Sequence, residues 1–115
     1  MTKINNAYER TRLQKIARIA TSGLVLDIGY AQLPNPYFAN VETIGLDLAK
    51  PEQPSGYAEE IQGSALDLPV ALGERQFDWI VAGEFIEHLR NPYDFLDSLH
   101  PFLARNGHIV LTTPN

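Results

Sequence analysis

The stretch from Glu84 to His88 carries three side chains that could do chemistry together. If the stretch is helical, residues at i, i+3 and i+4 share one face, so Glu84, Glu87 and His88 converge. Two carboxylates and an imidazole suit a divalent metal such as Mg²⁺, Mn²⁺ or Zn²⁺, although both acids could equally be solvated. Without a metal, His88 is the best general base, because imidazole titrates near neutrality. Glu84 and His88 are therefore the catalytic candidates.

Two aspartates, Asp27 and Asp47, stand 20 residues apart, each near the end of a short apolar run. A carboxylate at the end of a second parallel strand can accept both hydroxyl protons of a ribose, as it does in dinucleotide-binding folds. On its own, an acid at a strand end is also compatible with a solvated loop. Asp47 is the candidate ribose ligand.

Alternating short apolar runs and helical patterns must position these residues. The predicted strands are residues 24–29, 41–47, 58–62, 77–82 and 108–113. Such runs are too short for helices and are typical of buried parallel strands. Strands that alternate with helices and loops predict a parallel α/β sheet with right-handed crossovers. Ligands of such sheets bind beyond the carboxyl ends of the strands, where the candidate residues lie.

The helical patterns are less regular than the strands. Residues 4–21 predict an amphipathic helix, and Asn91-Pro92 supplies a cap and first turn for a second one. We expect Pro101 to kink or shorten that second helix and Asn106-Gly107 to end it. Asn35-Pro36 could start a further, very short helix.

Length and composition exclude several classes of protein. The chain has 115 residues, which predicts one domain over 1–115, with an N-terminal helix to residue 23 and a core over 24–115. A net charge of −5 argues against nucleic acid as a partner. The absence of cysteine excludes disulfides and thiolate chemistry. No apolar run approaches the ~20 residues of a membrane span and no signal peptide is recognisable, so we expect a cytoplasmic protein without a membrane partner.

Five motifs in order resemble the class I S-adenosylmethionine-dependent methyltransferases. The motifs are LVLDIG (24–29), IGLDL (44–48), GSALDLP (63–69), FDWIVAGEFIEHL (77–89) and NGHIVLTTPN (106–115). The resemblance implies S-adenosylmethionine as cofactor and a Rossmann-like three-layer sandwich with strand order 3-2-1-4-5. The family's closing strands 6 and 7 have no counterpart among the five runs. The nearest branch looks like the small O-methyltransferases related to the ubiquinone-biosynthesis enzyme, and the last motifs also resemble the small-RNA 2′-O-methyltransferases.

The resemblance also implies roles for individual residues. Gly29 lets the backbone approach the cofactor's methionine part, and Gly83 with its neighbours lines the methionine and sulfonium end. Asp27 is a further cofactor-binding candidate, and Tyr30 either covers the cofactor or merely wedges the loop. Asp47 takes the ribose hydroxyls, Leu48 packs on the adenine, and Ser64 and Ala65 lie where the family reads the adenine edge, with Asp67 as the neighbouring acid among the cofactor-binding candidates. Two departures matter: residues 30–34 lack the family's two further glycines, and Ser64 stands where the family commonly has an acid.

The leading interpretation is methyl transfer to an oxygen of a small molecule. The alternatives are a small-RNA 2′-O-methyltransferase-like enzyme, which this acidic chain disfavours, and a degenerate module without turnover that serves as a cofactor-binding domain or as a scaffold. A fifth strand with no successor would leave an apolar edge over residues 108–113. Either the chain is part of a longer protein, or this edge pairs with a second copy to form a homodimer.

Overall fold

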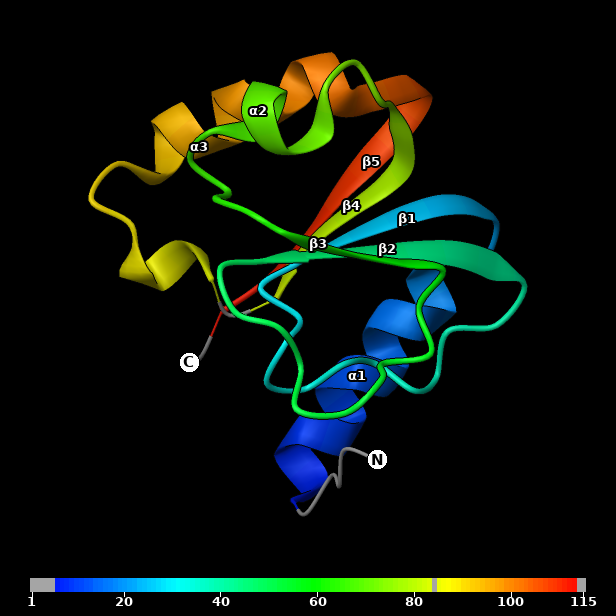
Figure 1. Ribbon diagram of the computed structural model, residues 1–115. Helices are drawn as coiled ribbons and strands as arrows, with labels where there is room; N and C mark the ends of the chain where they lie inside the picture. The colour runs from blue at the N-terminus through cyan, green and yellow to red at the C-terminus, as the bar shows by residue number, and fades with distance from the viewer. Residues whose placement is uncertain (1–5, 84, 114–115) are drawn as a thin grey trace.

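Five parallel strands form one sheet in the computed structural model, which describes residues 6–83 and 85–113 (Figure 1). The strands are β1 (Gly23–Ile28), β2 (Val41–Asp47), β3 (Glu59–Gln62), β4 (Phe77–Gly83) and β5 (Leu103–Thr112). Their order across the sheet is β3-β2-β1-β4-β5. The predicted fold class and strand order are therefore confirmed.

Helices cover both faces of this sheet, which makes three layers. The helices are α1 (Ala7–Ile19), α2 (Leu68–Leu72) and α3 (Pro92–Leu99), with short 3₁₀ helices η1 (Ile86–His88) and η2 (His100–Phe102). Figure 1 shows α1 on one face and α2 with α3 on the other. The long connections on either side of β2 run on the α1 face and contain no helix.

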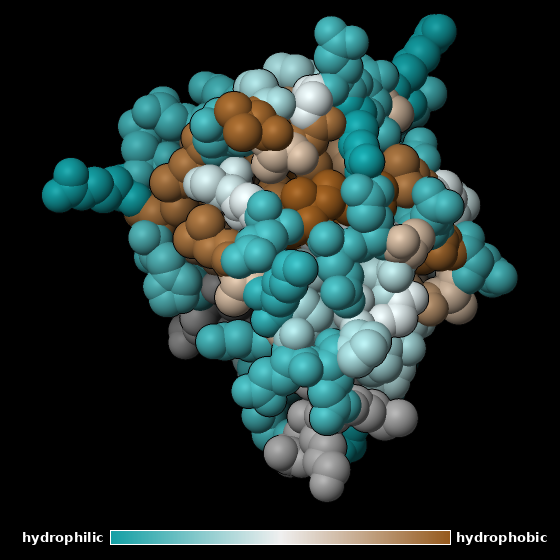
Figure 2. Space-filling model, in the orientation of Figure 1, coloured by the Kyte–Doolittle hydropathy of each residue, from teal (hydrophilic) through white to brown (hydrophobic). Residues whose placement is uncertain are grey.

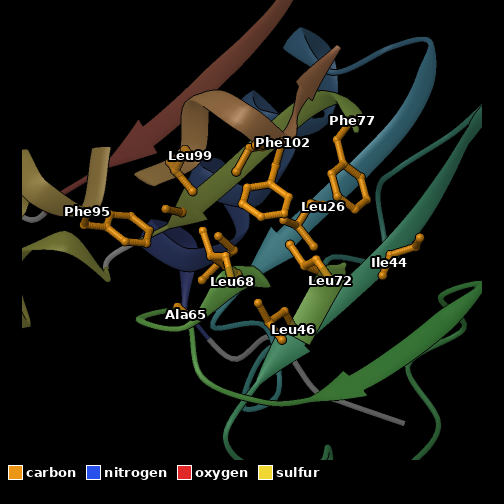
Figure 3. Packing of buried hydrophobic residues seen from close by; sticks show 13 residues of the cluster. Leu26, Ile44, Leu46, Ala65, Leu68, Leu72, Phe77, Phe95, Leu99 and Phe102 are labelled. Carbon is orange, nitrogen blue, oxygen red and sulfur yellow. The ribbon is translucent and has the colours of Figure 1, made fainter. Parts of the chain in front are cut away.

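The larger part of the core lies between the sheet and the α2–α3 layer. Leu26, Leu46 and Ile80 from three neighbouring strands are completely buried there against Leu68 and Leu99 (Figure 3 shows this cluster). The opposite face buries a smaller cluster of Val25, Val81, Ile16 and Ala20 under α1. Because successive strand residues point to opposite faces, burial on both faces explains the continuous apolar runs.

The helix boundaries follow from their caps and from one proline. Asn6 caps α1 by accepting a hydrogen bond from Glu9 N at 2.7 Å, and Asn91 caps α3 through Asp94 N at 3.1 Å. α3 ends at Leu99, two residues before Pro101, which cannot donate the next helical hydrogen bond. The prediction that Pro101 shortens this helix is confirmed.

Two local predictions were wrong. Asn106 has the expected positive φ of 65°, but it lies inside β5, which begins at Leu103 rather than at residue 108. The pairing with β4 shifts register there, so the left-handed residue forms a bulge instead of a helix end. Asn35 begins no helix, because its side chain accepts a hydrogen bond from Tyr37 N at 2.9 Å and closes a turn. Helix α2 was not predicted.

The surface reflects the same layering. In Figure 2 hydrophobic side chains gather over the α2–α3 layer, whereas the half around α1 and the long connections is hydrophilic. Over the part of the chain that the structure describes, no helix is long and apolar enough to cross a membrane.

Candidate active site

A cavity of about 530 Å³ lies at the carboxyl ends of β1 and β4, and residues of α1 form part of its wall. This volume lies in the range of small-molecule sites, about 300–1,000 Å³. Residues from four segments line it: α1, the end of β1 with the loop after it, the end of β4, and η1. The lining includes Arg12, Asp27, Gly29, Tyr30, Gly83 and His88. Five of these six were sequence candidates, and the carboxyl end of the sheet is where they were expected.

Asp27 is a buried acid at the end of β1. Its side chain accepts a 2.6 Å hydrogen bond from the hydroxyl of Tyr57. Burial raises the pKa of Asp27 to about 7, against the opposing effects of the Tyr57 hydrogen bond and of the positive charge of Arg12. The carboxyl group can therefore gain or lose a proton near neutral pH and can bind a cationic group when it is ionised.

Two glycines line the cavity wall, each for a different reason. Gly29 has a φ of +78°, a conformation that L side chains rarely adopt, and its N–H donates to the carbonyl of Leu46 at 2.8 Å. A Cβ atom at Gly83 would lie 2.6 Å from Nη1 of Arg12. Glycine at position 83 thus lets the Arg12 side chain cross the end of β4 on the cavity wall.

Asp47 lies at the end of β2, beside the cavity but not in its lining. One carboxylate oxygen accepts the N–H of Ala31 at 2.9 Å, and the other accepts the N–H of Ala49 at 3.1 Å. Each oxygen keeps a second lone pair, so the carboxylate could still accept hydroxyl groups. Its bond to Ala31 also fixes the loop that carries Tyr30.

The other nucleoside candidates lie beyond the ends of β2 and β3, outside the lining. Leu48 is 70% exposed, while Ala65 is buried in the core. The Ser64 hydroxyl accepts the N–H of Leu66 at 3.0 Å, and Asp67 precedes α2 at its N-terminus. These residues share one edge of the sheet with the cavity, but the structure does not bring them into it.

Glu84 lies outside the described residues, so the structure does not describe its place relative to Glu87 and His88. Over residues 85–88 the described chain forms the 3₁₀ turn η1 and no α-helix. Glu87 and His88 both line the cavity, with His88 Nε2 3.5 Å from Oε1 of Glu87. No group of three or more potential metal ligands exists among the described residues, so the structure gives the predicted metal site no support.

Sequence reasoning missed Arg12 and Tyr57. Arg12 is mostly buried on α1, and its Nη2 pairs with Glu9 Oε2 at 2.7 Å. Its place between apolar positions of an amphipathic helix gave only a weak signal. Tyr57 lies in a loop rich in proline and glycine, and nothing in the local sequence indicates that its hydroxyl reaches Asp27, 30 residues away.

A family model described as a methyltransferase domain matches residues 4–115 of the chain. A search of curated proteins found no match. The family match spans nearly the whole chain, and the sheet order and the position of the cavity agree with it. The chain therefore belongs to the methyltransferase-domain family, and its sheet order is that of the class I S-adenosylmethionine-dependent methyltransferase fold.

Proposed function

We propose that this domain binds S-adenosylmethionine and transfers its methyl group to an oxygen atom of a small molecule. One observation carries the proposal. The cavity at the ends of β1 and β4 places the buried carboxyl of Asp27 and the guanidinium of Arg12 in one lining. Groups of opposite charge suit the amino and carboxylate groups of the cofactor's methionine part.

The residues present fit this cofactor. Gly29 and Gly83 line the cavity, and Gly83 makes room for the Arg12 side chain that would pair with the carboxylate of the methionine part. In this proposal Asp47 at the end of β2 accepts the ribose hydroxyls, and the exposed side chains of Leu48 and Leu66 offer apolar surface to the adenine. When bound, S-adenosylmethionine supplies an electrophilic methyl group on its sulfonium.

The chain's own contribution is to hold the two reactants and to remove a proton. Asp27 and Arg12 orient the methionine part, and fixed orientation can replace much of the entropy cost of a bimolecular reaction. His88 lines the same cavity and is exposed, so its ring can take the proton of an acceptor hydroxyl. Oε1 of Glu87 lies 3.5 Å from Nε2 of the ring, on the wall of the same cavity.

The amino-acid composition supports two further parts of the proposal, a small-molecule acceptor rather than RNA and a cytoplasmic location. The chain carries 14 acidic and nine basic residues, which disfavours binding to phosphate backbones. It contains no cysteine, which fits a reducing compartment.

Calorimetric titration with S-adenosylhomocysteine tests binding first. We expect micromolar affinity, and no heat at millimolar ligand would leave only the reading of a scaffold without cofactor. Turnover is then followed as release of S-adenosylhomocysteine from S-adenosylmethionine with a panel of phenols, hydroxy acids and a short RNA. His88→Ala should slow methyl transfer by about 10²–10⁴-fold, whereas His100→Ala, an exposed histidine outside the cavity, should not. Turnover on RNA alone would contradict the small-molecule assignment.

A further inference from the structure

Tyr57 connects the cavity to the loop between β2 and β3, which does not line the cavity. The residue lies between β2 and β3, in a stretch that contains Pro51, Pro54 and Gly56. Its hydroxyl donates to Oδ2 of Asp27 at 2.6 Å and accepts the backbone N–H of Asn35 at 2.7 Å. One hydroxyl thus bonds both to the buried carboxyl group of Asp27 and to the loop over residues 30–35 that lines the cavity.

The loop over residues 30–35 is fixed by contacts rather than by glycine. Ala31 N donates to Asp47, Asn35 N donates to Tyr57, and Nδ2 of Asn35 donates to the carbonyl of Leu13 on α1 at 2.9 Å. The hydroxyl of Tyr57 is the contact that this loop shares with Asp27. Removing it would leave the buried N–H of Asn35 without a partner.

The ring of Tyr57 holds the hydroxyl in place. It stacks on the ring of Tyr30, with centroids 5.2 Å apart, and lies 6.3 Å from the ring of Phe38. Tyr30 in turn covers Gly45 of β2, where a Cβ atom would collide with its ring. These ring contacts hold the Tyr57 side chain with its hydroxyl at the end of β1. The position of the hydroxyl is therefore set by packing as well as by hydrogen bonds.

We propose that Tyr57 is a positioning residue of the cofactor site, whose hydroxyl orients Asp27 and keeps its carboxylate available to the amino group of the ligand. The proposal rests on the proposed function. Three groups act on Asp27: the Tyr57 hydrogen bond and the Arg12 charge favour its ionised form, and the Asp47 charge opposes it. Loss of the hydroxyl therefore favours the protonated acid, which cannot pair with an ammonium group.

The test compares Tyr57→Phe with the control Tyr93→Phe, which removes a hydroxyl from the exposed side chain on α3. Affinity for S-adenosylhomocysteine is measured between pH 5.5 and 8.5. Any protonation of the ligand itself affects the wild type, Tyr57→Phe and Tyr93→Phe equally, so it cancels when their affinities are compared. For Tyr57→Phe we expect about three- to tenfold weaker binding at pH 7 and recovery toward wild-type affinity at pH 8.5. A loss of affinity that is equal at every pH would show a merely structural role and would overturn the proposal.

A measurement without ligand separates this inference from the proposed function. The ¹³C shift of the Asp27 carboxyl is followed by NMR as a function of pH, and Tyr57→Phe should move its midpoint upward by about one pH unit. If this variant does not fold, 3-fluorotyrosine at position 57, a stronger hydrogen-bond donor, should move the midpoint downward. An unmoved midpoint contradicts the role of Tyr57 even if the cofactor binds. A moved midpoint without any cofactor binding refutes the proposed function alone.

Discussion

Asp27 should make the folded protein less stable as the pH rises, and Asp27→Asn should remove this dependence. The folded pKa is about 7 against an ordinary value of 3.8, because burial disfavours the charge. Between these two values the folded state binds a proton that the unfolded state has released. The contribution of protonated Asp27 to the free energy of unfolding is therefore fully present below pH 3.8, and it is lost as the pH rises to about 7.

The magnitude follows from the two pKa values. Each pKa unit corresponds to about 1.4 kcal/mol, so full ionisation of buried Asp27 costs about 4 kcal/mol. Between pH 5 and pH 8 the free energy of unfolding of the wild type should fall by about 2–3 kcal/mol relative to that of Asp27→Asn. An amide of nearly equal size keeps an acceptor for the Tyr57 hydroxyl but carries no charge.

Urea denaturation at several pH values between 5 and 8 measures this difference directly. Asp97→Asn, an exposed position on α3, is the control and should run parallel to the wild type. Asp27→Asn should also bind S-adenosylhomocysteine more weakly at pH 8, because a neutral amide cannot pair with the ligand's amino group. In this account the ionised carboxylate of Asp27 lowers the free energy of unfolding but is the form that binds the ligand's amino group. Parallel pH profiles for the wild type and Asp27→Asn would refute a buried, proton-binding Asp27.

Three further outcomes are expected. Asp47→Ala should weaken S-adenosylhomocysteine binding at least tenfold by calorimetry, since charge-assisted hydrogen bonds contribute about 1.5–3 kcal/mol each, and unchanged affinity would exclude the ribose role. Gly45→Ala should lower the free energy of unfolding by about 1–3 kcal/mol or more, because the new methyl group overlaps the ring of Tyr30, and a neutral effect in denaturation would contradict that packing. The outer edge of β5 has no neighbouring strand among the described residues, and pairing with a second copy stays a prediction. If this edge pairs with a second copy, sedimentation should show a wild-type dimer, and the substitution Leu111→Lys should convert it to a monomer. A wild-type monomer at high micromolar concentration would contradict this pairing.

Most of the fold could be predicted because its signals are local. β1, β2 and β4 are short apolar runs that end near the chemistry-bearing residues, and β3 is a weaker, more polar one. The positions of all four agree with the predictions to within a residue or two. β5 began earlier than predicted, because the left-handed Asn106 is compatible with a helix end and with a strand bulge alike. The choice between the two depends on pairing with β4, which local sequence does not encode.

The candidate site was only partly predictable for the same reason. Asp27, Gly29 and Gly83 follow or end strands, and topology alone brings them to one cavity. Tyr57 enters from a loop with no periodicity, and its role depends on packing against Tyr30. Glu87 and His88 lie in a three-residue 3₁₀ turn rather than in the α-helix on which their convergence with Glu84 was argued, and Glu84 lies outside the described residues.

Mapping S-adenosylhomocysteine by two-dimensional ¹H–¹⁵N NMR tests the central claim most directly. Backbone signals of Gly29, Ala31 and Gly83 should shift on titration, because these residues line the cavity or hold its loop. Signals of α3, such as that of Asp97, should stay unchanged, since α3 covers the opposite face of the sheet. Perturbations confined to residues outside the cavity, or none at millimolar ligand, would contradict a cofactor site at the ends of β1 and β4.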